Sequence, residues 1–268
     1  MPTTIPASIA TIASIATWNV NSIRARKDRT LAWLETHQPD VLCLQETKVT
    51  DNVFPRTDFE ALDYEVTVCG QKTYNGVALL SRTAPTDVTW RFDDDTEESE
   101  ARFLSAQVAG VQIICVYVPN GQVVGSDKYV YKLSWLEQLQ RYLEQHCDPA
   151  EPLILCGDLN IAPEDRDVCD PAEWANTVLC EPGVRDAFRR LCDWGLVDTF
   201  RLHHDADKLY SWWDYRQLAF QKNQGLRIDH ILVTQPVAKR CTGVHIDREA
   251  RKGKGASDHA PVIAEFSE

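Results

Sequence analysis

The stretch "PLILCGDLN", residues 152–160, decides the fold class. A short apolar run bounded by turn residues indicates a buried strand. This run ends in two polar residues, Asp158 and Asn160. Nine further apolar runs of similar length, most of them rich in β-branched residues, lie at 12–18, 40–45, 64–69, 76–81, 87–92, 102–108, 111–118, 227–233 and 260–266. The sequence therefore predicts many short strands.

Helical patterns interrupt these strands in a few places. Leucines recur at helical spacing at Leu133, Leu136, Leu139 and Leu143. A second helix is predicted between Pro182 and Gly195, and a third from Asp28 to His37, ended by Pro39. Many strands with a few helices predict two packed sheets flanked by helices, in an α/β or α+β sandwich. No linker or repeat is visible, so we expect one domain over residues 12–268, with residues 1–11 as a loose N-terminal extension.

Composition excludes several classes of protein. Hydrophobic residues make up 44% and charged residues 25% of the chain, as in ordinary globular proteins. No apolar run approaches the roughly 20 residues that a membrane span requires, so we expect no membrane partner. The nine cysteines are odd in number, form no C-x-x-C pair and often lie inside apolar runs. Reduced cysteines of this kind indicate a cytoplasmic protein.

The net charge of −12 argues at first against a nucleic-acid partner. However, charges farther apart than about 8 Å are largely screened at physiological salt, so local patches matter more than the total. Residues 22–29, "SIRARKDR", and 248–254, "REARKGK", each carry four cations and one anion. We interpret the acidic run "DDDTEESE", residues 93–100, as a solvated loop.

Polar residues with side-chain oxygens stand at the end or at the start of several predicted strands. They are Asn19, Asn21, Gln45, Glu46, Tyr117, Asp158, Asn160 and Asp229. Any one of them alone is more often a turn former or a helix cap. Together with Asp258 and His259 they form an oxygen-rich set without thiolates, and such ligands select Mg²⁺ or Mn²⁺ over zinc.

The stretch "GASDHAPV", residues 255–262, places Ser257, Asp258 and His259 side by side. Neighbours in an extended chain point to opposite faces, so these three cannot form a hydrolytic triad by themselves. His259 alone could be an ordinary histidine at a strand start. With a cation, however, the set suits attack of water on a phosphate ester. Asp229 would then fix the His259 ring, while Asp158 accepts a proton.

Eight motifs in order give the chain a family resemblance. They are "TWNVNSIRAR", "QPDVLCLQETK", "YNGVALLS", "VYVPNG", "CGDLNIAP", "SWWDYR", "GLRIDHIL" and "SDHAPV". Together they resemble the exonuclease III family of abasic-site (AP) endonucleases, within the endonuclease/exonuclease/phosphatase superfamily. The resemblance runs from about Ile12 to Phe266. It implies an α/β fold, a four-layer α/β sandwich of two mainly antiparallel β-sheets packed face to face with flanking helices.

The resemblance also implies a role for each site residue. The metal side would comprise Glu46, Asn21 and Asp258, and the catalytic residues would be Tyr117, Asp158, Asn160, Asp229 and His259. Whether Asp158 or Tyr117 activates the water stays open. Asn19 would hold the network, Ser257 would brace the turn, and Arg24, Trp212 and Leu226 would contact substrate. Leu226 stands where some relatives carry tryptophan, and this suggests a less tightly walled pocket.

The implied function is that of a Mg²⁺-dependent DNA repair nuclease. It would cut 5′ to abasic sites and remove nucleotides or blocking groups from the 3′ ends of double-stranded DNA, as a cytoplasmic monomer. One alternative is a superfamily phosphoesterase acting on inositol or lipid phosphates. A second is a DNA-binding protein without catalysis. The balance among the nuclease activities and the number of metal ions stay open.

Overall fold

The structure is a computed structural model that describes residues 12–267, so the expected N-terminal extension lies outside the described residues. The strands are β1 Ser14–Asn19, β2 Val41–Gln45, β3 Glu65–Cys69, β4 Val77–Ser81, β5 Thr86–Thr89, β6 Phe103–Val108, β7 Val111–Tyr117, β8 Leu153–Asp158, β9 Leu196–Asp198, β10 Asp229–Thr234, β11 Cys241–Ile246 and β12 Val262–Phe266. The helices are α1 Ile23–His37, α2 Arg56–Glu60, α3 Asp127–His146, α4 Pro171–Trp174, α5 Pro182–Trp194, α6 Thr199–His203 and α7 Gln235–Ala238. Short 3₁₀ turns are η1 Asp51–Val53, η2 Asp165–Asp167 and η3 Arg248–Arg251.

The strands form two six-stranded sheets. Sheet A has the order β11-β12-β1-β2-β4-β3, and sheet B has the order β5-β6-β7-β8-β10-β9. Each sheet contains one parallel pair, β1 with β2 and β7 with β8, and its other pairs are antiparallel. The two inner faces pack on each other around Ile15, Cys43, Cys115, Cys156 and Ile231. These side chains alternate with outward-facing ones because a strand has a period of two.

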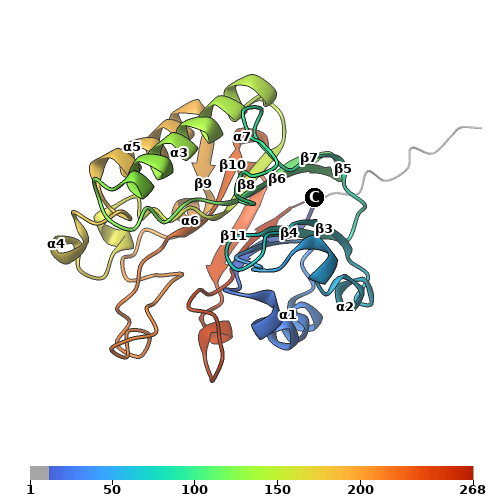
Figure 1. The fold of residues 1–268 in the computed structure, drawn as a ribbon, viewed down its shortest axis with the longest axis horizontal. Helices are drawn as coiled ribbons and strands as arrows, with labels where there is room; N and C mark the ends of the chain where they lie inside the picture. The colour runs from blue at the N-terminus through green and yellow to red at the C-terminus, as the bar shows by residue number, and fades with distance from the viewer. Residues whose placement is uncertain (1–11, 268) are drawn as a thin grey trace, which may run out of the picture.

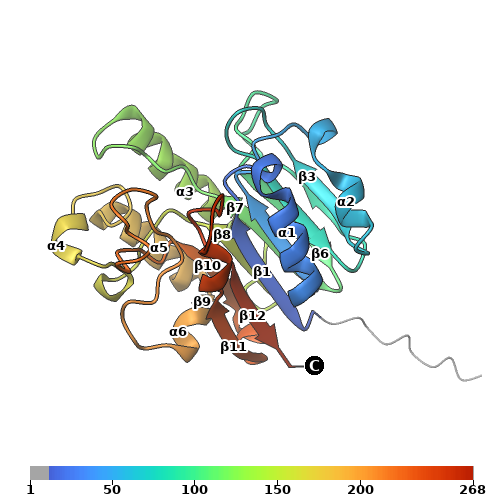
Figure 2. The ribbon, with the colours of Figure 1, turned by 90° about the horizontal axis from the view of Figure 1, so that it is seen from below.

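Helices cover the two outer faces. Trp33 and Leu34 of α1 and Phe59 of α2 pack on sheet A, whereas α3 and α5 cover sheet B. Figure 1 shows these four layers, and Figure 2 shows α1 lying across β1 of sheet A. The expected four-layer sandwich is therefore confirmed. No helix among residues 12–267 is long and apolar enough to cross a membrane.

The structure differs from the sequence prediction in several elements, since the short elements α2, α4, α6, α7 and β9 were not predicted. Helix α1 begins at Ile23 rather than Asp28, because its first turns are rich in Arg and Lys and carry no apolar stripe. Strand β11 was not predicted at all. Most of its residues are at least partly exposed, as at a sheet edge, so the sequence lacks the apolar run that marks a buried strand. Helix α5 matches its prediction, with Pro182 in its first turn and Gly195 at φ 133° after its last.

Candidate active site

Five strands bring the polar residues to one end of the two sheets. Strands β1, β2, β7 and β8 end there, and β10 begins there. The register pairs Asp158 with Tyr117 on one side and with Asp229 on the other. Asn19 lies opposite Gln45, one residue before Glu46. The topology therefore gathers at one edge the side chains that are far apart in the sequence.

His259 and Asp229 form a buried pair at this end. His259 Nδ1 lies 2.9 Å from Oδ2 of Asp229, and both side chains are almost fully buried. Ser211 donates its hydroxyl to the same Asp229 oxygen at 2.6 Å. Burial alone would lower the pKa of His259, but the carboxylates of Asp229 and Asp158 raise it above its ordinary value. The ring is thus held as a cation whose Nε2 lies 3.8 Å from Oδ2 of Asp158.

Asn19 joins the two central carboxylates. Its Nδ2 donates to Glu46 Oε1 and to Asp158 Oδ2, each at 2.9 Å. Glu46, Asp158 and His259 each offer an atom within 4.8 Å of the others. The two carboxylates could hold a metal ion there, whereas the charged His259 ring has no free lone pair for one. Burial raises the pKa of Asp158, the cationic His259 opposes this, and the nearby charges of Asp229 and Glu46 add to the increase.

The cluster fits a divalent cation by its charge and by its donors. Burial would raise the pKa of Glu46, but Lys48 and Asn19 hold it below its ordinary value, so its carboxylate is ionised. Asp158, in contrast, is buried beside the carboxylates of Asp229 and Glu46, and the positive charge of His259 does not fully offset their effect and that of burial. Oxygen donors of this kind suit a hard divalent cation.

Asn21 and Asp258, the other two residues of the predicted metal side, are hydrogen-bonded to each other. Asn21 Nδ2 donates to Asp258 Oδ1 at 3.0 Å, and Trp212 Nε1 donates to Asp258 Oδ2 at 3.0 Å. Asn21 Oδ1 accepts from Lys48 at 2.6 Å. Asp258 is thus satisfied by protein donors and lies outside the group that Glu46 forms. Lys48 also contacts Glu46 at 2.7 Å, so Asn21 lies next to the cluster, and the metal-side role of Asn21 and Asp258 stays a prediction.

Asn160 and Tyr117 flank Asp158. The Asn160 backbone N–H donates to Asp158 Oδ1 at 2.9 Å, and its side-chain oxygen accepts from Asn120 at 3.1 Å. Tyr117 is half-buried under the Arg102 guanidinium, which lies 4.5 Å from the ring centre. Burial, followed by the charges of Glu46 and Asp158, raises the pKa of Tyr117 well above its ordinary value.

Of the two adjacent tryptophans, Trp212 lies at the site and Trp213 lies in the core. Trp212 is half-buried, and its ring centre lies 6.5 Å from that of His259 and 6.1 Å from that of Trp174. Trp213 points away into a separate apolar cluster. Leu226 is completely buried in the core beneath Trp212. The expectation that Leu226 contacts substrate is therefore not supported, because its backbone pairs with Trp212 and its side chain faces inward.

Two further predicted residues lie at the margin. The Ser257 hydroxyl donates to the Asn19 carbonyl at 2.7 Å and accepts from the His259 backbone N–H at 3.2 Å, so it connects the two strands' ends. Arg24 is exposed on the first turn of α1. Its neighbour Arg26 instead contacts the site, with Nη2 3.0 Å from the Tyr215 hydroxyl.

Sequence reasoning missed four residues that hold the site. Lys48 contacts Glu46 at 2.7 Å, and it is the last residue of the motif "QPDVLCLQETK", so its position offered a signal. Ser211 in "SWWDYR" and Asn120 in "VYVPNG" also lie within the motifs of the resemblance, but no role was predicted for them. Lys132 is fully buried within the apolar face of α3, and its ammonium donates to the Asn160 and Val178 carbonyls at 2.7 Å each. A lysine in an amphipathic helix usually marks the solvent face.

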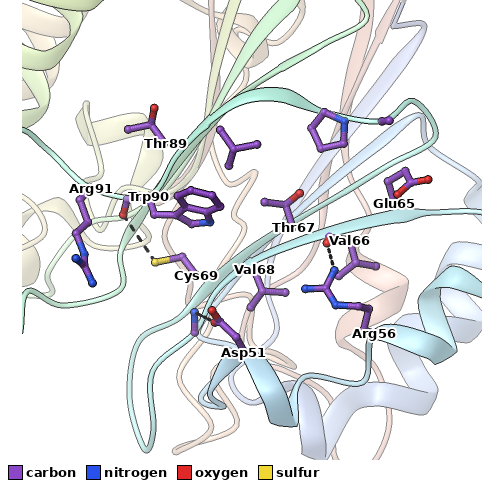
Figure 3. Close-up of a pocket in the computed structure, with 14 residues that line it drawn as sticks. Asp51, Arg56, Glu65, Val66, Thr67, Val68, Cys69, Thr89, Trp90 and Arg91 are labelled. Atoms are coloured by element: carbon purple, nitrogen blue, oxygen red, sulfur yellow. Dashed lines mark hydrogen bonds between the residues drawn. The ribbon is translucent and has the colours of Figure 1, made fainter. Parts of the chain in front are cut away.

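A large hollow lies away from this site. It measures about 940 Å³ and runs along the exposed edges of β3 and β5. Figure 3 shows Trp90, Cys69, Val68 and Thr67 along it, with Arg56 and Arg91 near its ends. Its charged residues do not converge, and Arg56 already donates to the Val66 carbonyl. Size alone therefore does not identify the site here.

Comparison with known proteins agrees with this geometry. Residues 16–259 match the model of the Endonuclease/Exonuclease/phosphatase family. Exodeoxyribonuclease III of Haemophilus influenzae is 40% identical over 261 residues, which cover 93% of this chain and 98% of the relative.

Two solved structures superpose closely. An AP endonuclease from Archaeoglobus fulgidus has a TM-score of 0.93 at 40% identity, covering 96% of this chain and 100% of the other. A 3′ phosphatase from Neisseria, bound to a product DNA hairpin, has a TM-score of 0.93 at 39% identity with the same coverage. The expected resemblance is confirmed: the chain belongs to the endonuclease/exonuclease/phosphatase family, among the relatives of exodeoxyribonuclease III.

Proposed function

We propose that this protein is a Mg²⁺-dependent DNA repair nuclease that cuts the phosphodiester bond 5′ to abasic sites and processes the 3′ ends of duplex DNA. The observation that carries the proposal is the buried Asp158, Asp229 and His259 arrangement at the sheet end. Relatives that share the fold are an AP endonuclease and a 3′ phosphatase with DNA bound. Mn²⁺ is the alternative ion.

Each residue of the chain has a task in the proposed reaction. Glu46, with Asp158 beside it, would hold the cation, which when bound neutralises negative charge on the phosphate. His259 donates from Nε2 to a phosphoryl oxygen, and Asp229 keeps its ring charged and oriented. As the bond from the water oxygen to phosphorus forms and the bond to the leaving oxygen breaks, Asp158 takes the water proton. Tyr117 is the weaker candidate for that step, because its pKa is raised and its phenol stays protonated.

Substrate recognition would use the surface around this centre. Trp212 supplies an aromatic wall next to His259, and an enclosed wall of this kind favours a sugar without a base. Asn19, Asn160 and Ser257 hold the network from behind. Arg24 and Arg26 at the start of α1 add positive charge for the DNA backbone.

We also propose that the chain acts as a cytoplasmic monomer, with residues 12–268 as one domain. The nine cysteines are all free thiols, as expected in a reducing compartment. Size-exclusion chromatography with light scattering would test the oligomeric state. A mass near 30.4 kDa supports a monomer, and twice that mass contradicts it.

A panel of end-labelled substrates tests the function. It comprises duplexes with one abasic-site analogue, with a 3′-phosphate at a nick and with a recessed 3′-hydroxyl, beside inositol phosphates, each in Mg²⁺ and in EDTA. We expect a Mg²⁺-dependent nick 5′ to the abasic site and processing of the 3′ ends. Intact DNA together with phosphate release from inositol phosphates would contradict the proposal.

A further inference from the structure

A second hollow lies beside the η3 turn, and most of its charged residues are positive. It measures about 530 Å³ and is lined by Phe220, Gln221, Arg248, Glu249, Arg251, Lys252, Gly253 and Lys254. Four of these eight residues are cations and one is an acid. This accumulation of positive charge occurs on a chain whose net charge is −12.

Arg251 is the unusual member of this hollow, because it is only 8% exposed and lacks a carboxylate partner. Among residues 12–267 its guanidinium makes one hydrogen bond, from Nη2 to the Trp213 carbonyl at 3.4 Å, and its Nε makes none. It lies over the Tyr215 ring at 5.0 Å and the Phe220 ring at 5.1 Å. Burial lowers its pKa, and Tyr215 and Asp258 oppose that effect. A buried cation with so few partners is costly unless a ligand completes it.

Of the three neighbouring cations, Lys252 has a carboxylate partner, whereas Arg248 and Lys254 have none among residues 12–267. Arg248 donates to the Phe220 carbonyl at 2.8 Å and lies 4.7 Å from the Phe220 ring centre. Lys254 is exposed, and Lys252 pairs with Glu249 at 2.6 Å. Arg29 of α1 fixes this turn by donating to the Lys252 and Lys254 carbonyls. The turn is therefore built, and its cations point to an anionic ligand.

Tyr215 connects Arg251 of the hollow with residues at the catalytic end. Arg251 stacks on its ring, and its hydroxyl lies 3.0 Å from Arg26 and 3.4 Å from Asn21. Arg26 and Arg251 thus both contact Tyr215, which lies between the active site and the hollow. Guanidinium groups match phosphate oxygens in geometry and charge.

We propose that the hollow around Arg251 binds a phosphate group of the DNA backbone outside the active site, so that the protein holds its substrate at a second point. This inference rests on the proposed function, because it takes DNA as the ligand. Backbone contacts of this kind position a duplex without reading its sequence. The site therefore strengthens binding of damaged and undamaged DNA alike.

Salt dependence of DNA binding tests the proposal. All proteins carry Asp158→Asn so that the DNA stays intact, and the affinity for a duplex of about 25 base pairs is measured from low to high salt. We expect Arg251→Gln, Arg248→Gln and Lys254→Gln each to weaken binding roughly 3- to 10-fold. Each should also reduce the slope of log affinity against log salt by about 1. The losses should be equal with and without an abasic site.

Two controls separate a binding role from a structural one. Arg190→Gln removes an exposed charge from α5, on the other outer face of the molecule, and should leave the slope unchanged. Arg251→Lys keeps the charge but loses the planar stack, and should retain the slope. If Arg251 only supports Tyr215, the Gln and Lys variants will impair binding alike with an unchanged slope, and Arg248→Gln and Lys254→Gln will be neutral. That result overturns the proposal.

A shortened duplex and free phosphate complete the test. Removing base pairs from one of the two ends should abolish the difference between the parent protein and the variants, because the distant phosphate is then missing. Inorganic phosphate that binds at this site while the DNA slopes stay unchanged would assign the hollow to a free anion and overturn the proposal. Failure of wild-type protein to cut any DNA would instead contradict the proposed function itself.

Discussion

Two buried charge clusters lie close to the same end of sheet B, and they differ in their balance of charge. We call the first the catalytic cluster, comprising Glu46, Asp158, Asp229, Asp258 and His259. We call the second the support cluster, comprising Asp167, Asp198, Arg201, Arg227 and His230. The catalytic cluster sets four carboxylates against one charged ring, with Lys48 at its edge. The support cluster sets two carboxylates against two guanidinium groups.

The support cluster is balanced in charge without a ligand. Arg227 Nε lies 2.7 Å from Asp167 Oδ1, its Nη2 lies 2.8 Å from Asp198 Oδ2, and Arg201 also contacts Asp167. Burial would raise the pKa of Asp167, but Arg227 and Arg201 lower it below its ordinary value. His230 donates from Nε2 to the Ile161 carbonyl and accepts from Arg227, so it is neutral. This cluster anchors the loop after β8 to β10.

The difference shows how the same residue types serve two purposes. A buried charge that is fully paired costs little further energy and rigidifies the fold. An excess of buried negative charge is destabilising unless a cation or substrate completes it, so it is retained for function. We therefore expect changes in the catalytic cluster to abolish activity without loss of stability, and changes in the support cluster to do the reverse.

The largest effect on activity should come from Asp158→Asn. The amide has the same shape but cannot accept the water proton, so the single-turnover cleavage rate should fall by about 10³-fold or more. Urea unfolding should show an unchanged or increased free energy of unfolding, because a buried negative charge is removed. A rate loss accompanied by several kcal/mol of destabilisation would contradict this prediction, because Asp158 would then stabilise the fold as the support cluster does.

Arg227→Met should have the opposite effect. Methionine fills much of the space but leaves Asp198 and Asp167 with unpaired charge in the core, and the expected destabilisation is about 3–5 kcal/mol. Urea denaturation measures it, with Arg190→Met on the exposed face of α5 as the matched control. At a temperature where the variant is folded, its cleavage rate should stay within a few-fold of wild type. A stable but inactive variant would contradict the distinction between the two clusters.

The catalytic cluster was largely predictable from the sequence, whereas the support cluster was not. Asp158 stands at the end of one apolar run and Asp229 near the start of another, so their position at the sheet edge follows from the strand pattern. Asp167 lies in an irregular loop, and nothing in its surroundings predicts burial beside Arg227. Leu226 shows the same limit, because the sequence names the residue but cannot say which way its side chain points.

His230 should make the free energy of unfolding depend on pH. Burial and the charge of Arg227 lower its pKa to about 4, below the unfolded value of about 6.5. Its contribution is fully present above pH 6.5 and is lost as the pH falls toward 4, because the unfolded chain binds the proton first. Between pH 7.5 and pH 5 the loss from this group should be about 2 kcal/mol. Comparing urea unfolding of wild type and His230→Gln at both pH values isolates it, and equal losses in the two proteins would contradict it.

The smallest effect should come from Ser211→Ala. Loss of the 2.6 Å hydrogen bond to Asp229 loosens the carboxylate that orients His259, so the cleavage rate should fall roughly 10-fold. The alkaline limb of the pH–rate profile should also move to lower pH, because His259 loses part of its support as a cation. Ser211→Thr keeps the hydroxyl and should restore both properties. A profile of unchanged shape would show that Ser211 does not act through His259.

Thermal unfolding in increasing MgCl₂, against NaCl of matched ionic strength, tests the central claim that the catalytic cluster needs a cation and the support cluster does not. A ligand that binds only the folded state raises the unfolding midpoint with concentration. We predict a Mg²⁺-dependent increase for wild type and for Arg227→Met, and none for Glu46→Gln combined with Asp158→Asn. An equal increase in that double variant, or no increase in wild type, would contradict the account.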